Sequence, residues 1–196
     1  MTVPKQYDSI PADRRNFIAA GAAGAAAVVL GDHAEAAPAA SSTAATRIVA
    51  EFLQNTAPEK IEAATNRLVA EDATYISLNF DNPELKKVLP WTGTQKGRQA
   101  YITTFTGVAK LWTIEDFKIF DLFGAGENVA VFGSFTYRSN ARGKSFTSPF
   151  SVHAKVKNGK IVYFLFMEDT FASSRSFSSG GTWTIKTDAN GPEFQV

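Results

Sequence analysis

The sequence predicts an α+β protein, and three observations lead to that prediction. Apolar residues recur at helical spacing through much of residues 45–111. After Trp112 the apolar period changes to two and stays there to about residue 171. The short sequences "GAGE", "NARG" and "NG" then separate four expected strands as turns would. Helices followed by a run of strands are typical of the α+β class rather than of an alternating fold.

Residues 1–36 are expected to be a twin-arginine-type signal peptide. Arg14 and Arg15 precede Phe17, an Ala/Gly/Val stretch over residues 18–30 follows, and "AEA" ends at Ala36 as a small-residue cleavage site. A membrane anchor is the alternative, but the apolar run is shorter than the ~20 residues that a spanning helix needs. We therefore expect a periplasmic or secreted bacterial protein that has no stable membrane anchor.

The helices are expected in the first half of the mature chain. Residues 37–44 resemble a linker, and a helix carrying an apolar stripe follows over residues 48–53. Thr56 is the predicted N-cap of a second helix, with Glu59 closing a capping box. A strand is expected within residues 71–80, and then a long loop that has the length of a lid. A third helix is predicted from about Arg98 to Leu111.

The second half of the chain is expected to form an antiparallel meander. Its strands are predicted within residues 115–123, 128–139, 144–157 and 160–171. Residues 45–172 therefore form one predicted domain. Residues 173–196 are rich in glycine and serine and are expected to be an extension, either loose or paired to a sheet edge through "TWTIK".

Composition excludes several classes of function. The chain has no cysteine, so disulfides, thiol catalysis and cysteine-ligated metals are excluded. It has two histidines, which are too few for a histidine-rich metal cluster. Its formal net charge of +1 provides no basic excess for binding nucleic acid. A hard cation bound by carboxylates alone stays possible, but no run of Asp and Glu has EF-hand spacing, and no metal or other cofactor is expected for the chemistry predicted below.

Two adjacent acids, Glu168 and Asp169, end the last predicted strand. The sequence "KNGK" is a two-residue hairpin signal, which places Val156 opposite Ile161. Uninterrupted pairing from there puts Asp169 at the end of the apolar face and Glu168 on the opposite face. A carboxylate beside an apolar face has a raised pKa, as a general acid or base requires. The alternative is that Asp169 only caps a helix or binds an arginine, and Glu168 is expected to be solvated or at an interface.

The preceding strand is expected to bring a tyrosine to the same place. If the "NARG" loop holds four residues, Phe135 and Tyr137 lie near Ser148, and therefore near Asp169. A loop one residue longer or shorter would move both side chains to the other face of the sheet.

The order of elements resembles the nuclear transport factor 2 superfamily, and in particular its SnoaL-like and ketosteroid isomerase-related members. The sequences "GTQKGRQAYITTF" and "NGKIVYFLFMEDT" carry this resemblance, which covers residues 45–172. It implies a cone-shaped fold with three helices packed on a curved antiparallel sheet. It also implies that Asp169 is the acid/base residue, that Trp91 lies on the pocket side, and that Tyr75 occupies a position where related enzymes hold water.

The resemblance further implies a homodimer formed through the outer face of the sheet. By the hairpin register, Phe164, Phe166 and His153 lie on that face, where exposed aromatic side chains would otherwise be a liability.

We therefore predict an apolar cavity that binds a small hydrophobic molecule. Asp169 would move a proton beside a carbonyl, and Tyr75 or Tyr137 would donate a hydrogen bond to the oxyanion, as in an isomerase, cyclase or dehydratase. A non-catalytic binder and a dimeric assembly domain are the alternatives. The remaining predicted lining residues are Phe52, Trp91, Tyr101, Phe105, Phe135, Val152, Leu165 and Met167.

Overall fold

The computed structural model describes residues 43–196; the predicted signal peptide and most of the predicted linker lie outside the described residues. The helices are α1 (Ala44–Leu53), α2 (Ile61–Leu68), α3 (Pro83–Val88), α4 (Arg98–Leu111) and α5 (Thr170–Arg175). The strands are β1 (Val69–Ser77), β2 (Gly93–Lys96), β3 (Trp112–Ala125), β4 (Asn128–Ser139), β5 (Ser145–Lys157), β6 (Lys160–Glu168), β7 (Thr184–Ile185) and β8 (Phe194–Gln195). None of the helices in this range is long and apolar enough to cross a membrane.

Six of the strands form one curved sheet in the order β2-β1-β6-β5-β4-β3. The meander from β3 to β6 is antiparallel, as predicted, and the α+β class is confirmed. The prediction of a wholly antiparallel sheet is wrong, because β1 pairs with β6 in parallel. This pairing makes the sheet mixed and places β1 in its interior, with β2 at the edge.

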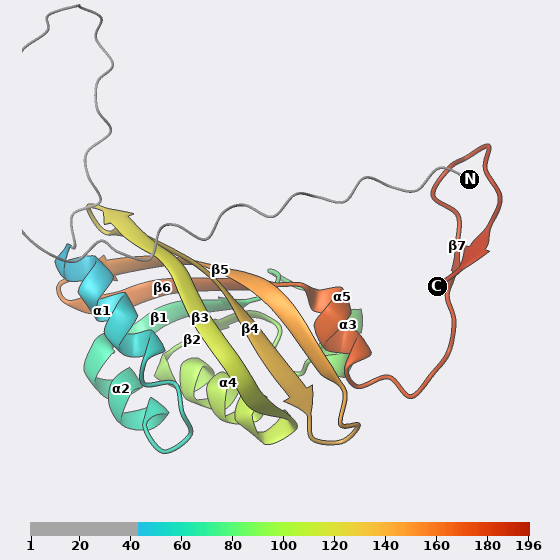
Figure 1. Ribbon diagram of the computed structural model, residues 1–196. Coiled ribbons are helices and arrows are strands. Elements are labelled where there is room, and N and C mark those ends of the chain that lie inside the picture. The colour runs from blue at the N-terminus through green and yellow to red at the C-terminus, as the bar shows by residue number, and fades with distance from the viewer. Residues whose placement is uncertain (1–42) are drawn as a thin grey trace, which may run out of the picture. The chain divides into compact units, whose positions relative to one another are not determined.

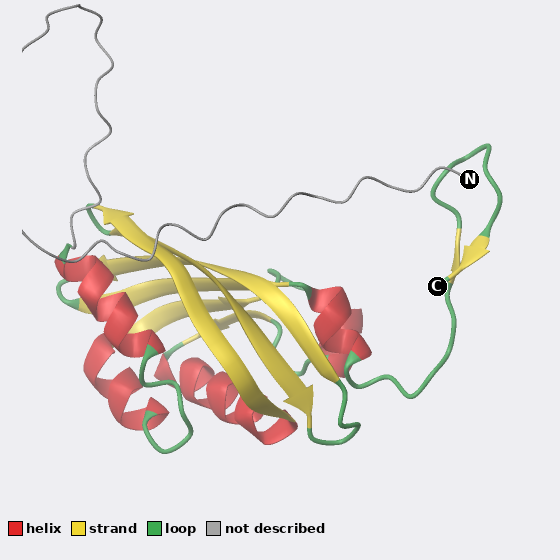
Figure 2. Ribbon diagram, viewed as in Figure 1, coloured by secondary structure: helices red, strands yellow, loops and turns green. Residues whose placement is uncertain are grey.

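Helices α1, α2 and α4 lie against one face of the sheet (Figures 1 and 2). The core between these layers is rich in aromatic rings. The ring of Phe52 on α1 meets Tyr101 on α4 at 5.8 Å and Phe164 on β6 at 5.5 Å, both edge to face. All three side chains are fully buried. Each contributes about 1.5–3 kcal/mol through burial of apolar surface, so the two layers are firmly joined here.

The bounds of α4 agree with the prediction, but the start of α2 does not. Helix α2 begins at Ile61 with no side-chain cap, so the predicted capping box at Thr56 is wrong. The Thr56 hydroxyl instead donates a hydrogen bond to the Leu53 carbonyl at the end of α1 (3.3 Å). Thr56 is thereby held beside the end of the first helix rather than at the start of the second.

The predicted registers hold for one hairpin of the meander and fail for the next. Strands β4 and β5 pair as expected, with Phe135 opposite Ser148. The β5–β6 hairpin starts as predicted, with Val156 opposite Ile161, but Lys155 then pairs with Tyr163. One residue of β6 is therefore extra. Such a bulge moves every later side chain of the strand to the other face.

The two long irregular segments contain short elements of their own. In the segment between β1 and β2, Asn82 caps α3 by accepting a hydrogen bond from the Leu85 N–H (3.0 Å), and Pro83 begins the helix. In the C-terminal extension, β7 and β8 form a separate two-stranded sheet. The "TWTIK" segment therefore pairs within the extension rather than with the main sheet.

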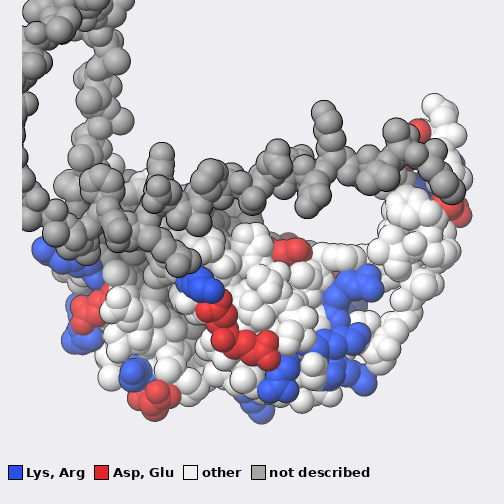
Figure 3. Space-filling view, viewed as in Figure 1, with Lys and Arg blue, Asp and Glu red and all other residues white. Residues whose placement is uncertain are grey.

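Charged side chains of both signs lie close together on the face that Figure 3 shows. Two ion pairs lie on these strands: Arg138 of β4 pairs with Glu115 of β3 at 2.9 Å, and Lys118 pairs with Asp116 within β3. Exposed pairs of this kind contribute little to stability.

Candidate active site

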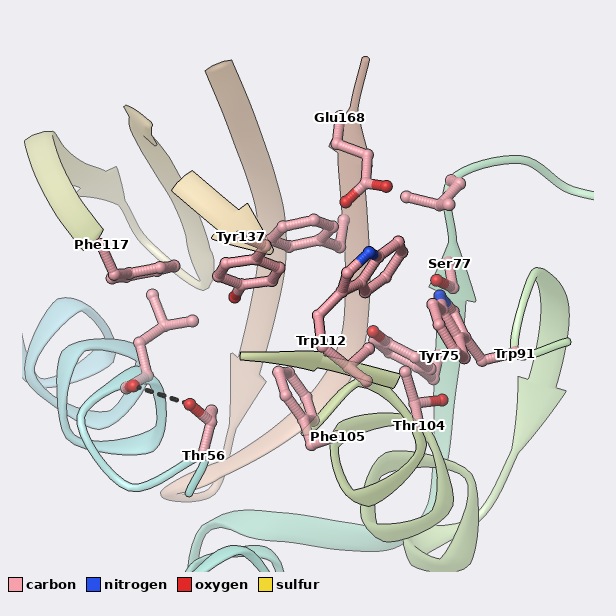
Figure 4. A pocket seen from close by; sticks show the side chains of 14 residues that line it. Thr56, Tyr75, Ser77, Trp91, Thr104, Phe105, Trp112, Phe117, Tyr137 and Glu168 are labelled. Carbon is pink, nitrogen blue, oxygen red and sulfur yellow. Dashed lines mark hydrogen bonds between the residues drawn. The ribbon is translucent and has the colours of Figure 1, made fainter. Parts of the chain in front are cut away.

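An apolar pocket lies between α4 and the concave face of the sheet (Figure 4). Its empty volume is about 540 Å³ with the open mouth included. The lining residues are Leu53, Thr56, Tyr75, Ser77, Leu78, Trp91, Thr104, Phe105, Val108, Trp112, Phe117, Tyr137, Phe166 and Glu168.

Glu168 is the only carboxylate among these lining residues. Figure 4 shows its side chain pointing from the end of β6 toward the middle of the pocket. Its Oε1 atom is buried and has no hydrogen-bond partner within residues 43–196. Burial raises the pKa of Glu168 from its ordinary 4.5 to about 7; the charge of Asp169 adds to this rise, and the nearby Ser173 hydroxyl opposes it.

The bulge in β6 is the reason that Glu168 faces inward. Val162 has no partner in β5, so the side chains of Phe164, Phe166 and Glu168 take the concave face. The prediction that Asp169 points into the cavity is therefore wrong.

Asp169 instead caps α5 at the surface. Its Oδ1 atom accepts hydrogen bonds from the N–H groups of Phe171 and Ala172, both at 3.0 Å. Its own N–H donates to the Ser148 hydroxyl at 2.8 Å. Ser148 and Asp169 are thus neighbours, as the sequence predicted, but the aspartate side chain points away from the pocket.

Two tyrosines complete the polar part of the site, Tyr75, which is buried, and Tyr137, which is partly buried. Burial is the main cause that raises the pKa of Tyr75 and of Tyr137, and the Glu168 charge raises both further. The Ser77 side chain opposes the rise at Tyr75. Both phenols therefore stay neutral at ordinary pH and are suited to donate hydrogen bonds. Both also lie close enough to Glu168 for its charge to change their pKa values.

The structure brings together some of the predicted site residues and separates others. Tyr75, Trp91, Phe105 and Tyr137 line the pocket, as expected. The other predicted lining residues do not reach it: Phe52, Tyr101, Phe135 and Val152 are packed in the core, and Leu165 and Met167 lie on the outer face of β6 because of the bulge.

The outer face of the sheet also differs from the prediction. Phe164 and Phe166, which were expected there, face the core and the pocket. His153 does lie outside, where its ring accepts or donates a hydrogen bond with Asn128 (3.1 Å). The outer face carries a different apolar row, which runs from Phe132 through Ser151 to Met167 on three neighbouring strands.

Several pocket residues were not predicted from the sequence, and Trp112 is the most important of them. It ends α4, and its indole N–H donates to the Ser176 hydroxyl at 2.9 Å. Ser77 lies two residues after Tyr75 on β1, so the period of two was an available signal for it. No local signal in the sequence pointed to Glu168, because the bulge reverses the parity.

This arrangement suits proton transfer in an apolar environment. A carboxyl group whose pKa is near 7 can either take up or release a proton, and two neutral phenols can stabilise a negative oxygen. Among residues 43–196, no group of three or more His, Cys, Asp and Glu side chains is placed to hold a metal ion.

The fold and pocket define a class: an α+β domain whose curved sheet and helices enclose an apolar pocket containing one buried acid. The chain belongs to the family of SnoaL-like domains, whose model matches residues 49–164. It is 42% identical over 142 residues to patulin synthesis protein F of Aspergillus clavatus, a match that covers 71% of each chain. It is 40% identical over 134 residues to patulin biosynthesis cluster protein F of Penicillium expansum, covering 67% of each.

Solved structures agree with this family. An NTF2-like protein from Burkholderia xenovorans superposes with a TM-score of 0.59 at 20% sequence identity, covering 71% of this chain and all of the other. At that identity the likeness concerns the fold alone.

Proposed function

We propose that the protein is an enzyme that moves a proton on a carbon atom next to a carbonyl group in a small apolar molecule. The observation that supports this most directly is the Glu168 carboxyl, whose Oε1 atom is buried in the pocket without a partner among residues 43–196 and whose pKa is raised by burial to about 7. A buried carboxyl oxygen without a partner lowers the stability of the folded protein. Groups of this kind are found most often at catalytic sites, where the raised pKa is needed.

In the proposed reaction, the Glu168 carboxylate removes the proton from carbon. The electron pair of the C–H bond forms a C=C bond to the carbonyl carbon, the π pair of the carbonyl moves to its oxygen, and Tyr75 or Tyr137 donates a hydrogen bond to the resulting oxyanion. When the carbonyl forms again, protonated Glu168 can return its proton to another carbon, which is an isomerisation. The electron pair of the enolate can instead attack a second carbonyl carbon of the same molecule, whose oxygen takes the proton from Glu168, which is a cyclisation. It can also expel a hydroxyl group on the neighbouring carbon, which leaves as water with the proton from Glu168, and this is a dehydration.

The relatives indicate a setting for this chemistry. Two proteins that are at least 40% identical to this chain are named for the synthesis of patulin. We therefore propose that this chain acts in the biosynthesis of a small organic molecule of that kind. The empty volume of the pocket, about 540 Å³ with its open mouth included, lies in the lower part of the range for small-molecule sites and favours a compact substrate.

The competing proposal is a non-catalytic binder, in which protonated Glu168 only donates a hydrogen bond to the ligand. Deuterium exchange distinguishes the two. The protein is incubated in heavy water with 2-tetralone, a flat ketone with acidic protons beside its carbonyl, and exchange is followed by NMR. The wild type should accelerate exchange above the buffer rate. Glu168→Gln should lose this acceleration, and the control Asp169→Asn should keep it.

The outcomes separate the proposals. Equal exchange by the wild type and Glu168→Gln would contradict the role of Glu168. If the wild type binds 2-tetralone without accelerating exchange, the protein is a binder for this class of molecule. Circular dichroism of each variant establishes that it is folded.

Export of the protein also stays a proposal, supported by Arg14, Arg15 and the small-residue sequence that ends at Ala36. The N-terminal sequence of the protein purified from its own host checks it. A mature chain that starts at Ala37 is expected, and a chain found in full length inside the cell contradicts export.

A further inference from the structure

A second hollow lies on the other side of one wall of the pocket. We call it the outer groove; its empty volume is about 620 Å³ with open solvent included. It runs between α4 and the segment that leads into β2. Its lining residues are Pro90, Trp91, Gln95, Thr103, Thr104, Gly107, Lys110 and Leu111. Trp91 and Thr104 line both the pocket and the outer groove, so these two side chains form the wall between them.

Two indole rings meet at this wall, and they are held very differently. The rings of Trp91 and Trp112 are 5.2 Å apart with 66° between their planes. Trp112 is fixed by its hydrogen bond to Ser176 (2.9 Å) and by stacking on Phe177 at 4.8 Å. The indole N–H of Trp91 makes no hydrogen bond within the part of the chain that the structure describes. Only packing therefore holds the Trp91 ring in place.

The backbone of Trp91, in contrast, is held. Its carbonyl accepts a hydrogen bond from the Gln95 side chain at 3.0 Å, and the next N–H, that of Thr92, donates to the Leu89 carbonyl at 3.1 Å. A held backbone and an unanchored side chain favour rotation of the ring about its own bonds rather than movement of the whole segment.

Gly107 leaves space for that rotation. A Cβ atom added at Gly107 would meet only the Trp91 ring, with Cε3 at 3.5 Å and Cζ3 at 4.0 Å. Glycine is a poor helix former, yet this one lies inside α4. The missing side chain keeps the groove open beside the indole.

Thr104 stands in the same wall as the Trp91 ring and gives the wall a polar centre. Its hydroxyl is buried and has no hydrogen-bond partner within residues 43–196. A buried hydroxyl without a partner is unfavourable, and a polar group of a ligand in a joined cavity would satisfy it.

We propose that Trp91 is a movable partition, whose indole rotates into the outer groove and joins it to the pocket. The position of the ring then sets the size of molecule that the site accepts and decides whether a ligand in the groove reaches the buried Thr104 hydroxyl. This inference does not depend on the chemistry of Glu168.

The absence of cysteine from the chain permits a direct test. Thr104→Cys places a single thiol beside the partition, at the buried position of the Thr104 hydroxyl, and its rate of reaction with methyl methanethiosulfonate reports exposure of that position. Thr65→Cys is the matched control, because Thr65 is also a buried threonine without a partner for its hydroxyl but lies on α2, away from both hollows. Each thiol is measured with Trp91 intact, with Trp91→Ala, with Gly107→Leu and with both changes.

Trp91→Ala should accelerate reaction at the Thr104→Cys thiol by about tenfold or more and leave the Thr65→Cys thiol unchanged. Gly107→Leu fills the groove beside the ring, so it should slow the Thr104→Cys reaction about fivefold when Trp91 is present and by less than about twofold in the Trp91→Ala background. If Gly107→Leu slows the thiol reaction equally with Trp91 present and with Trp91→Ala, the leucine itself covers position 104. The proposal is then wrong.

The proposal is equally overturned if Gly107→Leu has no effect beside Trp91, or if Trp91→Ala accelerates neither thiol or both alike. The measurement involves no turnover. Failure of the Glu168 mechanism and failure of the partition are therefore told apart by separate experiments.

Discussion

Glu168 and Asp169 are neighbours in the chain, and their carboxyl groups lie in opposite environments. The Oε1 atom of Glu168 is buried in the pocket and has no hydrogen-bond partner within residues 43–196, whereas Asp169 is exposed and caps α5 with two hydrogen bonds of 3.0 Å. The arrangement of Glu168 lowers the stability of the protein and is suited to proton transfer. The second contributes stability and needs no functional explanation. The two acids should therefore respond to substitution in opposite ways.

Asp169→Ala should destabilise the protein. The change removes the acceptor for two N–H groups at the start of α5, and loss of such a cap costs about 1 kcal/mol. Chemical unfolding in urea measures the difference. Asp169→Asn is the control, since asparagine caps helices as well as aspartate does. If both variants lose equal stability, the cap is not the cause.

Glu168→Gln should stabilise the protein at alkaline pH. The unfolded carboxyl loses its proton near pH 4.5, whereas the folded one keeps it until about pH 7. Between these values the folded state binds more protons, so the free energy of unfolding falls as pH rises. The full penalty, present above pH 7, is about 3 kcal/mol, and the neutral amide should remove much of it.

Urea unfolding of this variant at about pH 4.5 and about pH 8 checks the sign. A gain at the higher pH and little change at the lower is expected. An equal gain at both pH values would mean that the charge of Glu168 is not responsible.

The exchange reaction should share this pH dependence. A general base must be deprotonated, so the rate of deuterium exchange should fall about tenfold per unit as pH drops below the Glu168 pKa of about 7. The initial rate with 2-tetralone, measured from acid to neutral pH, provides the profile. A rate that rises as the pH falls contradicts the assignment of Glu168 as the base.

Much of the fold was predictable because its signals are local. The bounds of α4 and β4 follow from apolar periods of 3.6 and 2, and the pairing of Phe135 with Ser148 follows from a loop of ordinary length. The parallel pairing of β1 with β6 was not predictable in this way. It joins segments that are about ninety residues apart, and no short-range pattern specifies which strand lies beside β1.

The prediction of the candidate site failed because of a single unpaired residue, Val162. Hairpin parity was correct at Val156 and Ile161, and every position after Val162 was then assigned to the wrong face. Both faces of β6 are apolar, with Phe164 and Phe166 on one and Leu165 and Met167 on the other. The hydrophobic pattern therefore does not indicate the bulge, and the sequence prediction placed Asp169 rather than Glu168 in the cavity.

Gly133→Ala should be severely destabilising. A Cβ atom at Gly133 would lie 2.1 Å from the Lys118 carbonyl oxygen and 2.4 Å from the ring of Phe150. The first belongs to the paired backbone of β3 and the second to a buried side chain, so neither can shift easily. Phe150 also stacks on Phe117 at 4.9 Å, so the disturbance would reach the pocket wall. A loss of about 3 kcal/mol is expected, the upper end of ordinary overpacking. Thermal and urea unfolding measure it, with Gly180→Ala, which meets nothing within 4 Å, as the control.

The outer face of the sheet is predicted to pair two copies of the chain. Phe132 (44% exposed) and Met167 (41% exposed) flank Ser151 in one row across three strands, and Phe123 stacks beside Phe132 with ring centres 6.1 Å apart. A row of this kind is unfavourable in water unless another surface covers it.

Sedimentation should show a dimer for the wild type. Phe132→Arg combined with Met167→Arg should give a monomer, because burying two arginines without partners is costly. The control Phe80→Arg changes an aromatic side chain that is 70% exposed on the segment after β1 and should stay dimeric. A wild type that sediments as a monomer contradicts the pairing.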